Sequence, residues 1–161
     1  MLRLSWLISM SISLFGVMII ENFFTLSPEG QPGAGNLGAI GLALVMPFLL
    51  LSILTTYRFF LQVSRRSTDR MMGTIMLFFG FALIGVLVYY AIDYKNEAFA
   101  ALGGNTNNPE STIYGYPLLN QYTNHIFINF YTFAVVHTTF ALIGAIVGIF
   151  KPKKPPTLNE E

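Results

Sequence analysis

The sequence predicts an all-α integral membrane protein: a four-transmembrane-helix bundle with both termini cytoplasmic and a long external loop between the third and fourth helices. Composition is the first reason. Hydrophobic residues make up 53% of the 161 residues and charged residues only 11%, whereas about a quarter of a soluble domain is charged. A chain this short has too little interior to hide so much apolar surface from water. The second reason is the placement of its apolar segments and positive charges.

Four segments are long and apolar enough to cross a bilayer, because about 20 apolar residues span its hydrocarbon core. They cover about residues 4–24, 37–61, 71–92 and 126–150. Lipid offers the backbone no hydrogen-bond partners, so each segment is expected to be a helix. We therefore expect a single transmembrane domain over residues 1–150 and a short cytoplasmic tail over 151–161. Pro47 is expected to kink the second helix.

The positive residues predict the orientation, since cytoplasmic loops are rich in Lys and Arg. Eight of the nine fall on one side of the four segments, and only Lys95 falls on the other. The eight are Arg3, Arg58, Arg65, Arg66, Arg70, Lys151, Lys153 and Lys154. Both termini are therefore predicted to be cytoplasmic, and we expect a multi-pass protein of a bacterial plasma membrane.

The second external segment, about residues 93–124, is the longest connection in the chain. Its Gly-Gly-Asn-Thr-Asn-Asn-Pro stretch at 103–109 is expected to be flexible. Tyr114, Tyr116 and Tyr122 suit the membrane interface. Two readings stay open for this segment, namely a functional or partner-binding surface and a mobile linker.

Small residues at helical spacing predict where the helices pack closely, because lipid gives helix association no hydrophobic drive. One stripe lies in the first helix and one in the fourth: Ser5, Ser9, Ser13 and Gly16; Ala141, Gly144, Ala145 and Gly148. Each stripe can face a helix of the same chain or of another subunit, and the pattern does not decide between the two.

His137 lies near the middle of the fourth predicted helix, on its small-residue face. Ionisable groups inside a membrane are costly and are candidates for function. One interpretation is a proton relay, or a metal or haem ligand. The other, which we favour, is a neutral histidine that is hydrogen-bonded to a Ser or Thr of a neighbouring helix.

Glu21, Asp93 and His125 lie near the external ends of three predicted helices. A carboxylate together with an imidazole can bind a divalent metal or pass a proton. The same residues can equally form an ordinary hydrogen-bond network at the membrane interface, since no close sequence spacing ties them together.

Other cofactors and an enzymatic role have little support. The two histidines are twelve residues apart on one predicted helix, ~18 Å along its axis, so they cannot clamp one haem within one chain. The chain has no cysteine and no P-loop, Gly-x-Ser-x-Gly or His-Glu-x-x-His motif. A net charge of +1 gives no reason to expect nucleic-acid binding.

The favoured function is a small non-catalytic subunit of a larger membrane complex, such as a respiratory or transport assembly. Its expected partners are the lipid bilayer and other membrane subunits or further copies of the chain. One alternative is an oligomeric ion or proton channel or transporter that uses His137. A second is a metal- or quinone-linked redox component.

Overall fold

The computed structural model of the chain describes residues 1–33, 35–66 and 70–150, with side chains of the third helix described from Gly73 on. The predicted tail over 151–161 and its lysines lie outside the described residues. The described part is helical, with α1 (Leu2–Phe23), α2 (Leu37–Arg66), α3 (Arg70–Ala101), α4 (Asn124–Phe127) and α5 (Phe130–Phe150). It contains no strand.

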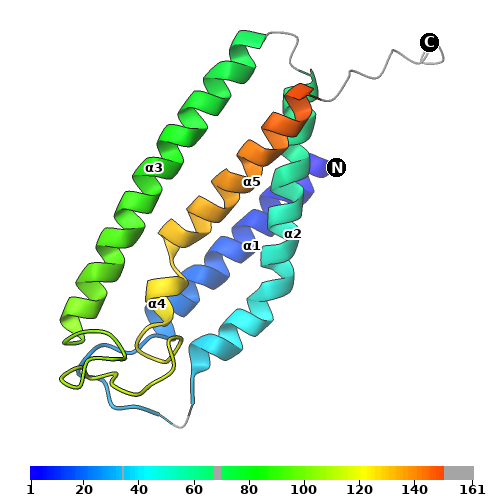
Figure 1. Cartoon of the computed structure of the whole chain (residues 1–161). Helices are drawn as coiled ribbons and strands as arrows, with labels where there is room; N and C mark the ends of the chain where they lie inside the picture. Colours follow the sequence, from blue (N-terminus) through cyan, green and yellow to red (C-terminus); the bar gives the residue numbers. More distant parts are fainter. Residues whose placement is uncertain (34, 67–69, 151–161) are drawn as a thin grey trace, which may run out of the picture.

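Four of its helical segments are long and apolar enough to cross a membrane: Leu2–Phe23, Leu37–Arg66, Gly73–Ala101 and Asn124–Phe150. This confirms the predicted all-α class and the prediction of four helices that are long and apolar enough to span a membrane. Figure 1 shows the start of α1 and the end of α5 toward the end of the bundle where α2 ends and α3 begins. The segments that follow α1 and α3 lie together at the opposite end.

The third helix is longer than predicted, since α3 continues nine residues past 92 to Ala101. Charged residues such as Asp93 do not stop a helix, and the alanines at 98, 100 and 101 favour one. The helix ends before Gly103, whose φ of 76° lies in the left-handed region that suits the residue after a helix. The following connection is therefore shorter than expected, residues 102–123.

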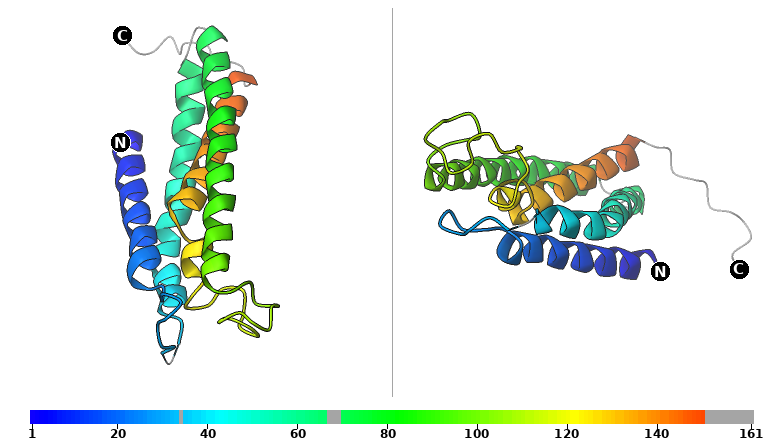
Figure 2. Two further views of the ribbon diagram at one scale, coloured as in Figure 1. Left: turned by 90° about the vertical axis from the view of Figure 1, so that its left-hand side faces the viewer. Right: turned by 90° about the horizontal axis from the view of Figure 1, so that it is seen from below.

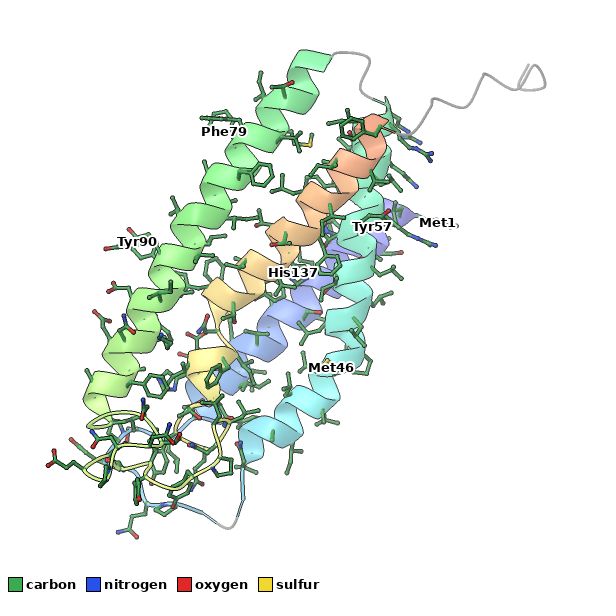
Figure 3. The ribbon with its side chains drawn as sticks, viewed as in Figure 1. Met1, Met46, Tyr57, Phe79, Tyr90 and His137 are labelled. Atoms are coloured by element: carbon green, nitrogen blue, oxygen red, sulfur yellow. The ribbon has the colours of Figure 1, made fainter. Side chains whose placement is uncertain are left out.

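The fourth predicted helix is not continuous. It begins earlier than expected, at Asn124, and it is interrupted at Ile128 and Asn129. By contrast, α2 runs through Pro47 as one helix, and it bends in its first half (Figure 1) near the Met46 labelled in Figure 3. That bend agrees with the effect expected of a proline inside a helix.

The helices form an open arrangement in which α2 and α5 are central. α2 packs against α1 on one side and α5 on the other, and α3 packs mainly on α5. The view from below in Figure 2 (right) shows α1, α2, α5 and α3 following one another in that order.

Close approach of α5 to α2 depends on two glycines. A Cβ added at Gly144 would lie against the backbone oxygen of Tyr57, and one added at Gly148 would lie 2.8 Å from the backbone oxygen of Leu61. On α1, Gly16 is buried and faces the side chain of Val45 on α2. Most of both predicted stripes therefore packs within the chain, although Ser5 is exposed.

Residues 102–123, which we call the cap, are folded and not an extended linker. Three of its residues, Leu102, Ile113 and Tyr122, form a small buried cluster with Ile126 of α4. Hydrogen bonds close its turns, among them the Thr112 N–H to the Leu102 oxygen (2.9 Å) and the Gly115 N–H to the Thr106 oxygen (3.1 Å). Tyr122, expected at the membrane interface, is instead buried, because its ring joins this cluster and its hydroxyl donates to the Gly30 oxygen at 2.8 Å.

Candidate functional site

A seam of polar side chains runs between α1, α2 and α5, and we call it the polar seam; all its members are buried except Trp6, which is half-buried. Its members are Trp6, Ser9, Ser13, Ser52, Thr55, Thr56 and His137. Two contacts join α1 to α2: the Trp6 indole N–H donates to the Thr56 hydroxyl at 2.9 Å, and the Ser9 and Thr55 hydroxyls lie 3.1 Å apart. The seam thus links helices by hydrogen bonds in a region that is otherwise apolar.

His137 is the ionisable member of the polar seam and is only 4% exposed. Its Nδ1 lies 2.8 Å from the backbone oxygen of Phe133, and its Nε2 lies 2.8 Å from the Ser52 hydroxyl. A carbonyl oxygen only accepts hydrogen bonds, so Nδ1 carries the hydrogen. The neutral ring then accepts at Nε2 from Ser52, which is the geometry of a helix–helix hydrogen bond to a serine.

The Ser52 hydroxyl has a second acceptor, the backbone oxygen of Leu49 at 2.9 Å. If His137 gains a proton, Nε2 becomes a donor and can donate to the Ser52 oxygen, while the Ser52 hydrogen turns to Leu49. Every polar atom keeps a partner in both states, and no heavy atom has to move. Both ring nitrogens are occupied in either state, which leaves none free to ligate a haem or a metal.

Two cavities meet at His137. One, of about 230 Å³, is lined by residues of all four long helices, including Trp6 and Met76. The other, of about 200 Å³, lies toward the α4 end and is lined by residues such as Leu42 and Phe127. His137 borders both, and no charged residue lines either. His137, labelled on α5 in Figure 3, lies in the middle of the candidate span Asn124–Phe150.

The interruption between α4 and α5 is built around Asn129, which is completely buried. Its Nδ2 donates to the backbone oxygens of His125 (2.7 Å) and Ile126 (3.1 Å), and its Oδ1 accepts from the Thr132 N–H at 2.9 Å. One side chain therefore provides hydrogen-bond donors to backbone oxygens of α4 and caps the start of α5. This explains how a helix can break inside an apolar segment without leaving backbone groups unpaired.

Glu21 is brought to the start of α5 as well. One carboxylate oxygen accepts from the Phe130 N–H and the other from the Tyr94 hydroxyl, both at 3.3 Å. A carboxylate at a helix N-terminus is favoured by the helix dipole. Glu21 therefore connects α1, α3 and α5.

The predicted group of Glu21, Asp93 and His125 is only partly brought together. Glu21, Tyr94 and His125 line one cavity of about 310 Å³, and the Tyr94 and His125 rings meet edge to face with centroids 5.7 Å apart. Asp93 is exposed and does not line this cavity. Among the described residues, no group of three or more His, Cys, Asp or Glu side chains could hold a metal ion. His125 Nδ1 is buried and has no hydrogen-bond partner in the described part of the chain.

Four residues that contribute to these sites, Ser52, Thr55, Thr56 and Tyr94, were not singled out from the sequence. Ser52, Thr55 and Thr56 sit at helical spacing within an apolar run, and that spacing is a signal that points to one buried face. Tyr94, by contrast, belongs to no such pattern, and nothing in the sequence indicates that it contacts Glu21.

Comparison with known proteins adds no relative. No protein-family model matches the chain, and no curated protein and no solved structure was found to match it.

Proposed function

We propose that the chain is a small non-catalytic subunit of a larger membrane complex and that α3 is the helix through which it joins its partner. We also infer the orientation with both termini in the cytoplasm, and a location in a bacterial plasma membrane. The sorting of eight positive residues to one side supports the orientation.

The observation that carries the proposal is the low burial of α3. Among its described side chains, only Gly73 and Leu87 are buried. Its outer side carries large aromatic rings, with Phe78 68% and Phe79 66% exposed, and Figure 3 shows Phe79 pointing away from α5. Gly85 has open space where a Cβ would lie.

A small residue with open space beside it is what a second helix needs for close approach. Helices in lipid associate by packing and not by hydrophobic drive, so an exposed apolar face alone indicates only contact with lipid. Gly85 within an aromatic surface adds the shape that a helix from another subunit can fit. This combination supports a function in helix–helix contact over one in chemistry on this chain.

Gentle purification from the native membrane tests the proposal. The unaltered chain should carry a stoichiometric partner in mild detergent, and Gly85→Leu should lose it because the new side chain fills the space at the contact. Ala43→Leu is the matched control, since Ala43 is exposed on α2; it should retain the partner. An unaltered chain that purifies alone, or equal partner recovery from both variants, would contradict the proposal.

Proton transfer through His137 is a second candidate function. What supports it is the pair of satisfied hydrogen-bond arrangements with Ser52 and Leu49 and the position of His137 between two cavities. The proton would bind at Nε2 while the Ser52 hydrogen turns to the Leu49 oxygen, and Ser52 would turn back to Nε2 once that proton had left. Apolar cavity walls oppose it, because a proton needs polar or water partners along its path.

Flux measurements in proteoliposomes distinguish this candidate from the first. Proton entry, followed with an enclosed pH-sensitive dye, should be abolished by His137→Phe. His125→Phe applies the same change to the other histidine of the chain and should leave the flux unchanged. A purified chain that shows no flux above empty vesicles removes the candidate.

A further inference from the structure

The cap is divided into two parts by charge. All charged residues at this end of the molecule lie before residue 111: Glu21, Glu29, Asp93, Lys95, Glu97 and Glu110. Of these, Glu110 belongs to the cap itself. From Ser111 to Phe150 the sequence contains no Asp, Glu, Lys or Arg. The second part of the cap, residues 111–123, therefore carries no charge, although it connects two helices outside the apolar core.

This uncharged part exposes apolar side chains. Tyr114 is 57% exposed, Tyr116 38%, Leu118 59% and Leu119 36%. We call these four residues the 114–119 surface. Four large apolar side chains close together on an uncharged loop form a surface that water solvates poorly.

Hydrogen bonds fix the position of this surface along the length of the helices. The Thr123 hydroxyl donates to the Leu118 oxygen at 2.7 Å, and Thr123 directly precedes α4. The Leu26 N–H donates to the Gln121 oxygen at 2.8 Å, and Leu26 follows the end of α1. The 114–119 surface therefore lies close to the ends of two candidate membrane spans.

The cap also reaches beyond the outline of the helices. Both views in Figure 2 show part of it projecting sideways past α3. In a membrane, a segment that projects sideways at the end of the spans lies over lipid and not over the bundle.

We propose that the 114–119 surface lies in the interfacial layer of the bilayer, with Leu118 and Leu119 directed toward the acyl chains and the tyrosine hydroxyls among the headgroups. Tyrosine suits this layer because its ring is apolar and its hydroxyl polar. The absence of charge favours lipid as the occupant over a water-facing protein, whose contact would need a polar rim. This inference does not depend on the proposed function.

Spin labels can test it, because the chain has no cysteine. Single-cysteine variants Leu118→Cys, Asn107→Cys and Phe78→Cys are labelled with a nitroxide and reconstituted alone into phosphatidylcholine vesicles. Asn107 is an exposed residue of the first part of the cap, and Phe78 is exposed on the outer side of α3, which faces lipid when the chain is reconstituted without a partner. The measurement is the accessibility of each label to oxygen, which partitions into lipid, and to a water-soluble nickel chelate.

The oxygen-to-nickel accessibility ratio at position 118 should be several-fold higher than at 107 and lower than at 78. A ratio at 118 equal to that at 107 places the surface in water and overturns the proposal. Low accessibility to both reagents also overturns it, because a second copy of the chain would then cover the surface in place of lipid.

Discussion

Helices α2 and α3 are both long and strongly apolar, yet they are used in different ways. The buried residues of α2 are small or hydroxyl-bearing: Gly38, Gly41, Ser52, Thr55, Thr56 and Ser64. α3 has few such contacts and leaves most of its surface exposed. Apolar character therefore decides only that a helix enters the membrane. Small and hydrogen-bonding residues decide which helix it packs against.

The largest effect on stability is expected for Gly144→Ala, at the contact of α5 with α2. The added methyl group would meet the backbone oxygen of Tyr57, and backbone cannot move aside as a flexible side chain can. We expect the free energy of unfolding to fall by about 3 kcal/mol, measured by denaturation in mixed micelles.

Gly85→Ala on α3 is the matched control, because a Cβ there meets nothing within 4 Å. It should leave stability unchanged or raise it by up to about 1 kcal/mol, since alanine favours a helix over glycine. If both variants lose the same stability, the contrast between the two helices is wrong.

The next effect concerns the link between α2 and α5. Ser52→Ala removes the partner of His137 Nε2, and His137→Phe removes the other side of the same bond. Interhelical hydrogen bonds in membranes contribute about 0.6 kcal/mol on average and about 1.7 at most. A double-mutant cycle should give a coupling free energy in that range, and a coupling of zero would show that the contact contributes nothing.

Asn129→Ala tests the interruption between α4 and α5. The change leaves the His125 and Ile126 oxygens without this donor, and it removes the acceptor of the Thr132 N–H at the start of α5. Loss of a cap costs about 1 kcal/mol, so we expect faster amide hydrogen exchange at the start of α5. Asn22→Ala is the control, because within the described ranges the Asn22 side chain bonds only to its own helix, at the Met18 oxygen, and is exposed. Exchange at Phe130 to Thr132 that responds equally to both changes would contradict this role.

Features that depend on local composition could be predicted from the sequence, and features that depend on contacts between helices could not. The four spans could be predicted because apolar length is a local property, and α2 begins at 37 as expected. The break at Asn129 could not be predicted, because it depends on one side-chain amide that donates to two backbone oxygens and also accepts from the Thr132 N–H. His137 could be placed on the small-residue face from spacing alone, but its partner on α2 depends on how two helices cross.

The candidate group at the other end shows a similar limit. Glu21 and His125 do line one cavity, because both lie at helix ends on the same side of the bundle. Asp93 does not, because α3 continues past it to Ala101, and on this helix Asp93 is exposed while its neighbour, about 100° further around the helix, lines the cavity. Tyr94, the next residue, contacts Glu21 in its place.

The smallest expected effect on stability is that of Phe78→Ala on the outer side of α3. Phe78 is 68% exposed, and its ring meets only the neighbouring Phe79 among the ring contacts of the described residues, so the free energy of unfolding of the isolated chain should change by less than about 0.5 kcal/mol. Recovery of a partner from native membranes should nevertheless fall, because the ring belongs to the surface that we assign to helix–helix contact. Phe15→Ala on α1, where the ring is 67% exposed, changes the same residue type on another helix. Equal recovery from both would mean that lipid alone covers α3, and the difference between α2 and α3 would then be one of packing within the chain only.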